Sequence, residues 1–215
     1  MGVNMKKKRI LFDVDGVLLD SMPIWENSAN LYLLEEFGID APPEVDQNCA
    51  TLSLLESGAY IKELYPQITL SARELADGVA GFIRERYWEV PEKKGMAKVV
   101  HWLKEQGHLM YLATASEEKN VEGALRNLGV WDCFLDIYTC TEIGYSKNYA
   151  EYYKTVAKRI GVSCEELIMV EDSLHSMVTA KRAGLTVIGS ADMVNEIKQV
   201  CDVYLEELEQ LQNWL

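Results

Sequence analysis

Two carboxylates, Asp13 and Asp15, follow directly after the short apolar run of residues 10–12. An apolar run that ends near a glycine, here Gly16, indicates a buried strand of a parallel sheet. Charge at the end of a buried strand needs compensation, because an unpaired buried charge is costly. Side chains two apart on a strand share a face, so we expect both carboxylates to reach one point. Two solvated acids are the alternative for such a pair taken alone.

Further polar residues follow two other apolar runs or begin a helical pattern. They are Thr114, Ala115, Ser116, Lys147, Glu171 and Asp172. Taken singly, Thr114 could be an ordinary β-branched strand residue. Ser116 could contact a substrate or cap the next helix, and neither alternative is favoured. Lys147 could be a solvated surface lysine, but it is expected at a helix start, where it opposes the helix dipole and a local function is more attractive.

Alternating strand and helix patterns would bring these residues together. Apolar runs lie at residues 10–12, 109–114, 134–138, 167–170 and 185–189. From residue 91 onwards they alternate with amphipathic helical patterns that end at glycines. This alternation predicts an α/β fold, a Rossmann-like parallel sheet with helices on both faces. In such a sheet the chemistry collects at the carboxyl ends of the strands.

The segment from residue 21 to residue 90 has a different pattern. Its apolar residues recur at helical spacing in three stretches, near residues 25–37, near residues 51–64, and after the capping-box sequence of residues 71–74. No part of it reads as a strand. We therefore predict a core domain of residues 1–20 and 91–215, with an inserted α-helical domain of residues 21–90.

The segment Asp13-Val14-Asp15-Gly16-Val17-Leu18-Leu19-Asp20-Ser21 resembles the first motif of the haloacid dehalogenase (HAD) superfamily, in its phosphatase branch. The residues around Thr114, Lys147 and Asp172 match the three later motifs in order. The helical segment 21–90 stands where the family carries a cap domain. The resemblance covers essentially the whole chain and implies a Rossmann-like core with a helical cap.

The resemblance also implies a phosphoric monoester hydrolase and a role for each matched residue. Asp13 would be the nucleophile that forms an aspartyl-phosphate. Asp15 would protonate the leaving alkoxide and then take a proton from the attacking water. The phosphate-binding residues would be Thr114, Ala115, Ser116 and Lys147.

Mg²⁺ is the cofactor that the resemblance implies. The carboxylates of Asp13 and Asp172 and the backbone carbonyl of Asp15 would hold it, and Glu171 would bind it directly or through water. The cation would allow the anionic Asp13 to approach an anionic phosphate.

Charge and composition narrow the partners. The net charge is −13 and no basic cluster occurs beyond the first nine residues, which argues against nucleic acid as a partner. No apolar run is long enough to cross a membrane. The five cysteines are odd in number and lack a C-x-x-C spacing, which favours a reducing compartment. We expect a cytoplasmic enzyme for a small phosphorylated metabolite, and the oligomeric state is open.

Two rivals of the phosphatase remain. A sugar-phosphate mutase, similar to β-phosphoglucomutase, must bind a second phosphate on its cap, which calls for a basic residue there. Residues 11–61 contain no Lys or Arg, so the phosphatase is favoured. A catalytically inactive HAD-fold binding module is the other alternative. Asp15 favours an enzyme that cleaves a phosphate ester, because the dehalogenases of the superfamily lack this second acid.

Overall fold

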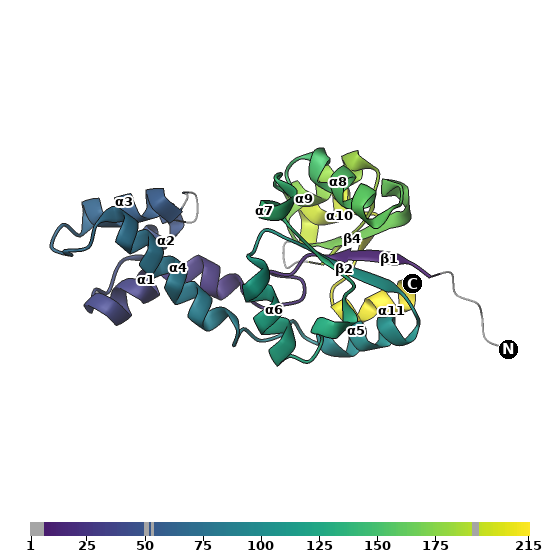
Figure 1. Cartoon of the computed structure of the whole chain (residues 1–215), viewed down its shortest axis with the longest axis horizontal. Helices are drawn as coiled ribbons and strands as arrows, with labels where there is room; N and C mark the ends of the chain where they lie inside the picture. Colours follow the sequence, from purple (N-terminus) through teal and green to yellow (C-terminus); the bar gives the residue numbers. More distant parts are fainter. Residues whose placement is uncertain (1–6, 50–51, 53, 191–193) are drawn as a thin grey trace. The chain divides into compact units, whose positions relative to one another are not determined.

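A computed structural model describes residues 7–49, 52, 54–190 and 194–215 (Figure 1). The chain divides into two compact units. Unit 1 comprises Met1–Asp20 and Pro91–Leu215, and unit 2 comprises Ser21–Val90.

Unit 1 is built on a parallel sheet whose strand order is β3-β2-β1-β4-β5-β6. The strands are β1 (Arg9–Phe12), β2 (Leu109–Thr114), β3 (Ile137–Thr139), β4 (Leu167–Glu171), β5 (Thr186–Gly189) and β6 (Val203–Tyr204). The apolar run of β1 lies in the middle, where Leu11 pairs with Tyr111 on one side and Met169 on the other. Strands buried on both faces are apolar throughout, and this explains their unbroken runs. The predicted α/β class is confirmed.

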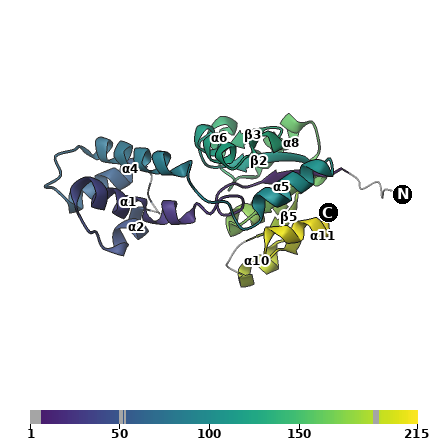
Figure 2. The ribbon, with the colours of Figure 1, turned by 90° about the horizontal axis from the view of Figure 1, so that it is seen from below.

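Helices cover both faces of this sheet (Figures 1 and 2). One face carries α5 (Met96–Glu105), α6 (Glu118–Asn127) and α11 (Leu211–Trp214), and the other carries α8 (Ala150–Ile160), α9 (Leu174–Ala183) and α10 (Val194–Val200). On the second face Tyr152, Tyr153 and Met177 pack in one apolar cluster with Leu11 and Met169. Among the described helices, none is both long and apolar enough to cross a bilayer.

Unit 2 consists of four helices in the residues that the structure describes. They are α1 (Met22–Phe37), α2 (Pro43–Cys49), α3 (Leu54–Leu64) and α4 (Ala72–Tyr87). Helix α4 begins with the predicted capping box, in which Ser71 and Glu74 exchange hydrogen bonds with each other's backbone. Its apolar side packs on α1, where the rings of Tyr32 and Phe82 meet edge to face. The predicted helix near residues 51–64 begins at Leu54, and Thr51 lies outside the described residues.

Several short elements differ from the sequence-based expectation. The third strand is Ile137–Thr139 and not 134–138, although the backbone N–H of Leu135 already donates to the carbonyl of Met110 at 2.8 Å. Strand β6 and the helices α2, α7 (Cys140–Ile143), α10 and α11 were not predicted. A strand of two residues or a helix of one or two turns is too short to produce a recognisable period. Helix α2 starts at Pro43, and proline suits a first helical position.

Candidate active site

Three neighbouring strands end at the same edge of the sheet and place the candidate residues there. Phe12 of β1 pairs with Leu112 of β2 and Val170 of β4. The next backbone group, the N–H of Asp13, still donates to the carbonyl of Val170 at 2.9 Å. Asp13, directly after β1, therefore lies at nearly the same level as Thr114 and Glu171, the last residues of β2 and β4.

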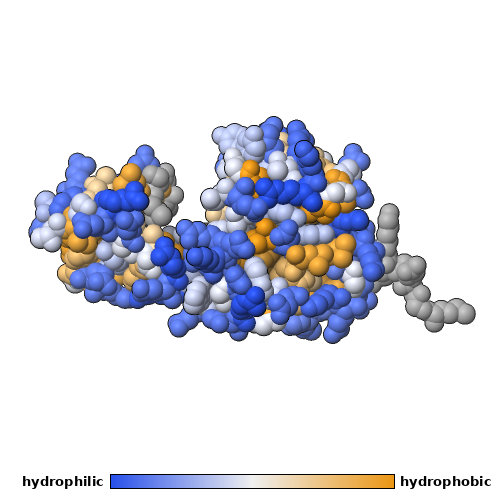
Figure 3. All heavy atoms as spheres, viewed as in Figure 1, coloured by the Kyte–Doolittle hydropathy of each residue, from blue (hydrophilic) through white to orange (hydrophobic). Residues whose placement is uncertain are grey.

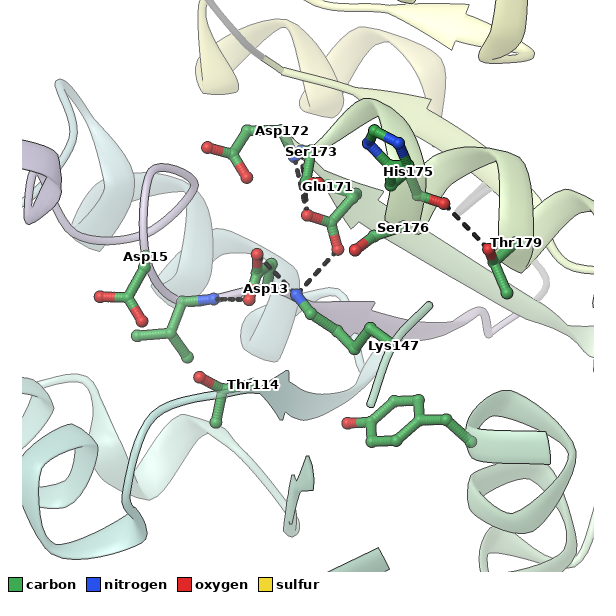
Figure 4. Close-up of polar contacts among 12 residues, drawn as sticks. Asp13, Asp15, Thr114, Lys147, Glu171, Asp172, Ser173, His175, Ser176 and Thr179 are labelled. Carbon is green, nitrogen blue, oxygen red and sulfur yellow. Dashed lines mark hydrogen bonds and ion pairs between the residues drawn. The ribbon is translucent and has the colours of Figure 1, made fainter. Parts of the chain in front are cut away.

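Lys147 lies between two of these carboxylates (Figure 4). Its Nζ is 2.7 Å from Oδ2 of Asp13 and 2.9 Å from Oε2 of Glu171. The exposed fractions are 7% for Lys147, 6% for Asp13 and 0% for Glu171, so this is a buried ion cluster. Lys147 was predicted at the start of a helix, but it belongs to the loop before α8, which begins at Ala150. The helix-dipole argument for Lys147 is therefore wrong, and its two ion pairs explain its position.

Glu171 connects this lysine to the loop after β4. Its Oε1 accepts the backbone N–H groups of Asp172 at 3.2 Å and Ser173 at 3.1 Å, while Oε2 accepts from Lys147. Both oxygens of Glu171 are thus already hydrogen-bonded within the protein. The sequence showed Glu171 as a strand-end acid but gave no sign of its contact with Lys147.

We expected the carboxylates of Asp13 and Asp15 to reach one point. In the structure the carboxylate of Asp15 does not belong to the acidic cluster that contains Asp13. Its Oδ2 instead accepts a hydrogen bond of 2.6 Å from the hydroxyl of Ser116. The strand ends at Phe12, so the alternation of side chains that places residues 13 and 15 on one face no longer applies. Ser116 does not cap helix α6 either, because the N-cap residue there is Glu117.

The backbone N–H of Ser116 donates to Oγ1 of Thr114 at 3.0 Å. Oγ1 of Thr114 thus accepts one hydrogen bond, and its hydroxyl hydrogen can be donated to another oxygen. Thr114 is fully buried, whereas Ala115 between the two residues is exposed.

Gly16 contributes in a way that the sequence did not reveal. Its φ of +77° lies in the left-handed region, and a Cβ on this residue would stand 2.0 Å from Oδ2 of Asp172. Any other residue would be strained and would displace the Asp172 carboxylate. The close approach of the β1 loop to Asp172 therefore requires glycine at this position.

Comparison with known proteins places this site in a family. The model of the haloacid dehalogenase-like hydrolase family matches residues 10–190, which is most of the chain and contains every candidate residue. The chain belongs to this family.

Individual relatives agree with the HAD assignment. Hexitol phosphatase B of Escherichia coli (strain K12) is 27% identical over 208 residues, which cover 94% of this chain and 92% of the relative. The magnesium-bound structure of the HAD protein YfnB from Bacillus subtilis has a TM-score of 0.78 at 21% identity and covers 98% of this chain and 99% of its own. The β-phosphoglucomutase of Clostridium difficile has a TM-score of 0.71 at 20% identity, with 97% and 96% coverage. The two structures share the HAD fold.

The acids of this HAD site form a set of ligands that suits a cation. One carboxylate oxygen from each of Asp13, Glu171 and Asp172 lies within 4.8 Å of the others. Three carboxylates against the single ammonium of Lys147 leave an excess of negative charge in a mostly buried place. An all-oxygen set of this kind suits a hard divalent ion such as Mg²⁺.

The pKa values reflect the same excess of negative charge. Burial, followed by the charge of Glu171, raises the pKa of Asp13 well above its usual value, although Lys147 opposes the shift. Burial, followed by the charge of Asp13, raises the pKa of Asp172 from 3.8 to about 6. Burial alone would lower the pKa of Lys147, but Asp13 and Glu171 raise it well above 10.5, so this lysine stays charged. A bound cation would favour the ionised form of both aspartates.

Proposed function

We propose that this HAD-family protein is a Mg²⁺-dependent phosphatase that hydrolyses a small phosphate monoester through an aspartyl-phosphate on Asp13. The observation that carries the proposal is the setting of Asp13, whose carboxylate lies 2.7 Å from Lys147 and within the acidic cluster of Glu171 and Asp172. The similarity to a protein named as a hexitol phosphatase supports a phosphorylated metabolite as the substrate.

The attacking group is held from two sides. The backbone N–H of Val14 donates to Oδ1 of Asp13 at 2.8 Å, and Nζ of Lys147 contacts Oδ2. Orientation of the nucleophile before the reaction lowers the entropic part of the barrier. Lys147 also supplies positive charge where the phosphoryl oxygens would arrive, and the Thr114 hydroxyl adds a donor.

Asp15 is the group that would transfer protons. It would protonate the alkoxide that leaves and later accept a proton from the water that cleaves the aspartyl-phosphate. The hydroxyl of Ser116 donates to Oδ2 of this carboxylate at 2.6 Å and fixes its orientation.

A resident Mg²⁺ would neutralise charge on the phosphoryl group and on the acids around it. Its ligands would be the carboxylates of Asp13 and Asp172 and the backbone carbonyl of Asp15. Glu171 accepts three hydrogen bonds, two on Oε1 and one from Lys147 on Oε2, whereas each oxygen of Asp13 accepts one. We therefore propose that Glu171 acts through Lys147 and the β4 loop and does not bind the cation directly.

Unit 2, residues 21–90, would serve as the cap that selects the alcohol part of the substrate. Residues 19–20 and 91–95 would be the hinge. The magnesium-bound structure of the relative YfnB is described as revealing interdomain movement, which supports such a role. Closure would exclude water and strengthen the electrostatic contacts of the phosphoryl group.

Two measurements test the proposal. Hydrolysis of p-nitrophenyl phosphate should stop in EDTA and return with Mg²⁺, and undiminished turnover in EDTA would contradict the mechanism. Rapid quenching during turnover, followed by reduction with borohydride, should convert Asp13 to homoserine, which mass spectrometry of the peptide detects. Modification of another carboxylate would assign the nucleophile elsewhere, and absence of turnover would favour a binding module.

A sugar-phosphate mutase is the second candidate, because a β-phosphoglucomutase shares the fold. Phosphorus NMR on β-glucose 1-phosphate with a catalytic amount of glucose 1,6-bisphosphate separates the two activities. The phosphatase should release inorganic phosphate. Formation of glucose 6-phosphate faster than release of inorganic phosphate would overturn the phosphatase assignment. Lys62 or Arg73 would then be the candidate basic residue that binds the distal phosphate.

A further inference from the structure

Unit 1 contains a cavity at the edge of the sheet opposite to the candidate active site. Its volume is about 340 Å³, which is the size of a pocket for a small molecule. Arg9 and Thr186 line it and are the first residues of β1 and β5, so the cavity lies where these strands begin. Asp13 follows the other end of β1, and four residues of strand span about 13 Å. The cavity is therefore separate from the acidic cluster.

The cavity contains the basic segment of residues 7–9 in a protein that is otherwise acidic. Hydrophilic residues cover much of the visible surface of unit 1 (Figure 3), and the sequence has 34 acidic against 21 basic residues. Lys7 and Lys8 both line the cavity, and neither forms an ion pair within the described part of the chain. Two ammonium groups at one cavity favour an anionic ligand.

Two glutamates also line the cavity, but they do not cancel this charge. Oε1 of Glu166 lies 3.5 Å from Nη1 of Arg9, and its Oε2 accepts hydrogen bonds from the backbone N–H and the hydroxyl of Ser163. Glu166 is thus engaged by Arg9 and by the turn before β4. Glu165 is exposed, so solvent and salt screen its charge. The lysines therefore keep an excess of positive charge.

The backbone of the basic segment is fixed to the sheet. The backbone N–H of Lys8 donates to Nδ1 of His108 at 3.2 Å, and its carbonyl accepts from the N–H of Leu109 at 2.9 Å. Arg9 continues this pairing as the first residue of β1. Groups that are positioned before a ligand arrives lose less conformational freedom on binding. The basic residues are thus presented from an ordered strand end.

Trp214 of α11 supplies an aromatic surface in the same cavity. Figures 1 and 2 show the end of α11 on the side of the sheet where β1 begins. Trp214 is 38% exposed, and its indole makes no hydrogen bond or ring contact with another described residue. Nucleobases stack on exposed aromatic side chains, and Ile168 adds an apolar wall. An indole beside two ammonium groups fits an anion that carries a flat ring better than an inorganic anion.

We propose that this cavity binds a nucleoside phosphate, with the base against Trp214 and the phosphate groups near Lys7 and Lys8. The lysines would form charge-assisted hydrogen bonds with the phosphate oxygens. The cavity has room for one nucleotide, and the sequence has no further basic cluster along which a nucleic-acid strand could continue. The inference goes beyond the proposed phosphatase function and does not depend on it.

ADP is the probe, because it carries no phosphate monoester for the proposed phosphatase to hydrolyse. Calorimetric titration of the full chain should show one ADP bound per chain, both in Mg²⁺ and in EDTA. Adenosine and inorganic pyrophosphate should each bind about tenfold more weakly than ADP. Binding only in Mg²⁺, or no binding of ADP at all, would overturn the proposal. Pyrophosphate that binds as tightly as ADP would overturn the assignment to a nucleoside phosphate.

Two variants locate the site. Trp214→Leu and Lys8→Gln should each raise the dissociation constant of ADP about tenfold. Quenching of tryptophan fluorescence by ADP should also disappear in Trp214→Leu. Trp88→Leu and Lys119→Gln are the matched controls, because these residues are exposed, do not line the cavity, and should leave the dissociation constant unchanged.

The remaining outcomes also decide the matter. An unchanged affinity for ADP in both Trp214→Leu and Lys8→Gln would place ADP elsewhere and overturn the proposal. If Trp214→Leu fails to fold, Lys8→Gln and Lys7→Gln still decide, because Lys7 is exposed and its substitution keeps the backbone contacts. Asp13→Asn should bind ADP as tightly as the wild type, and weaker binding there would place ADP at the acidic cluster.

Discussion

Asp13 in unit 1 and Asp46 in unit 2 are both buried carboxylates, yet their surroundings differ. Asp13 lies 2.7 Å from the ammonium of Lys147 and close to two more acids, whereas Asp46 is held by two backbone N–H groups. Asp13 is therefore part of a charged group in which each member changes the protonation of the others. Asp46 instead links α2 to the backbone of α1 through these two hydrogen bonds. The first arrangement suits a reacting group, and the second suits a structural contact between two helices.

The largest contrast between the two regions should appear on removal of each charge. Asp13→Asn keeps the shape but removes the attacking oxyanion, so turnover of p-nitrophenyl phosphate should fall by about three orders of magnitude or more. Asp46→Asn should leave turnover of this substrate nearly unchanged. Thermal melting and circular dichroism should show both variants folded. Comparable losses in the two variants would remove the distinction between a reactive and a structural carboxylate.

Asp15→Asn should have the next largest effect, and it should depend on the leaving group. Alkyl phosphates need a proton on the departing oxygen, so their turnover should fall by about 10²–10⁴-fold. p-Nitrophenolate leaves without a proton, and the loss for its ester should be smaller. Ser116→Ala should produce the same pattern in weaker form, because the hydroxyl only holds Asp15. Equal losses on both kinds of ester would argue against Asp15 as the general acid.

Glu171→Gln tests whether Glu171 acts through Lys147. The amide can keep the backbone N–H contacts but loses the charge that pairs with the ammonium, so kcat should fall by about 10–100-fold. The Mg²⁺ concentration for half-maximal activity should change less than in Asp172→Ala. A shift in Mg²⁺ requirement as large as that of Asp172→Ala would make Glu171 a direct ligand.

The smallest effect concerns stability in the absence of metal. The pKa of Asp172 is raised from 3.8 to about 6, so between these values the folded state binds more protons than the unfolded state. In EDTA its contribution therefore destabilises the fold as the pH rises from about 4 to 6. Asp172→Asn should raise the Tm at pH 7.5 in EDTA by roughly 2–4 °C, a modest value because the side chain is partly exposed.

Mg²⁺ should stabilise the wild type and stabilise Asp172→Asn much less. Scanning calorimetry across pH, with and without Mg²⁺, measures both effects. A Tm difference between the wild type and Asp172→Asn in EDTA that stays constant from pH 4 to pH 7 would contradict the raised pKa of Asp172.

Local sequence patterns were sufficient to predict the α/β class and the strands that carry the candidate residues. The apolar runs ending in Asp13, Thr114 and Glu171 are local signals, since buried parallel strands must be apolar throughout. The motif order was sufficient to name the family that the comparison then identified. The short elements α2 and β6 escaped because they are stabilised by packing and not by a period of their own.

Which of these residues lie in contact follows from the packing of distant segments and not from local patterns. Lys147 reaches Asp13 and Glu171 from a loop that is distant in sequence, and the Asp15 carboxylate turns to Ser116 because the strand ends at Phe12. The requirement for glycine at position 16 arises from a contact with Asp172, 156 positions along the chain, which no local pattern encodes. Likewise, Tyr149 stands at helical spacing from the buried Tyr152 and Tyr153 but is 60% exposed, since it precedes helix α8. Periodicity reports what one element buries, whereas pairings between elements depend on how the chain packs.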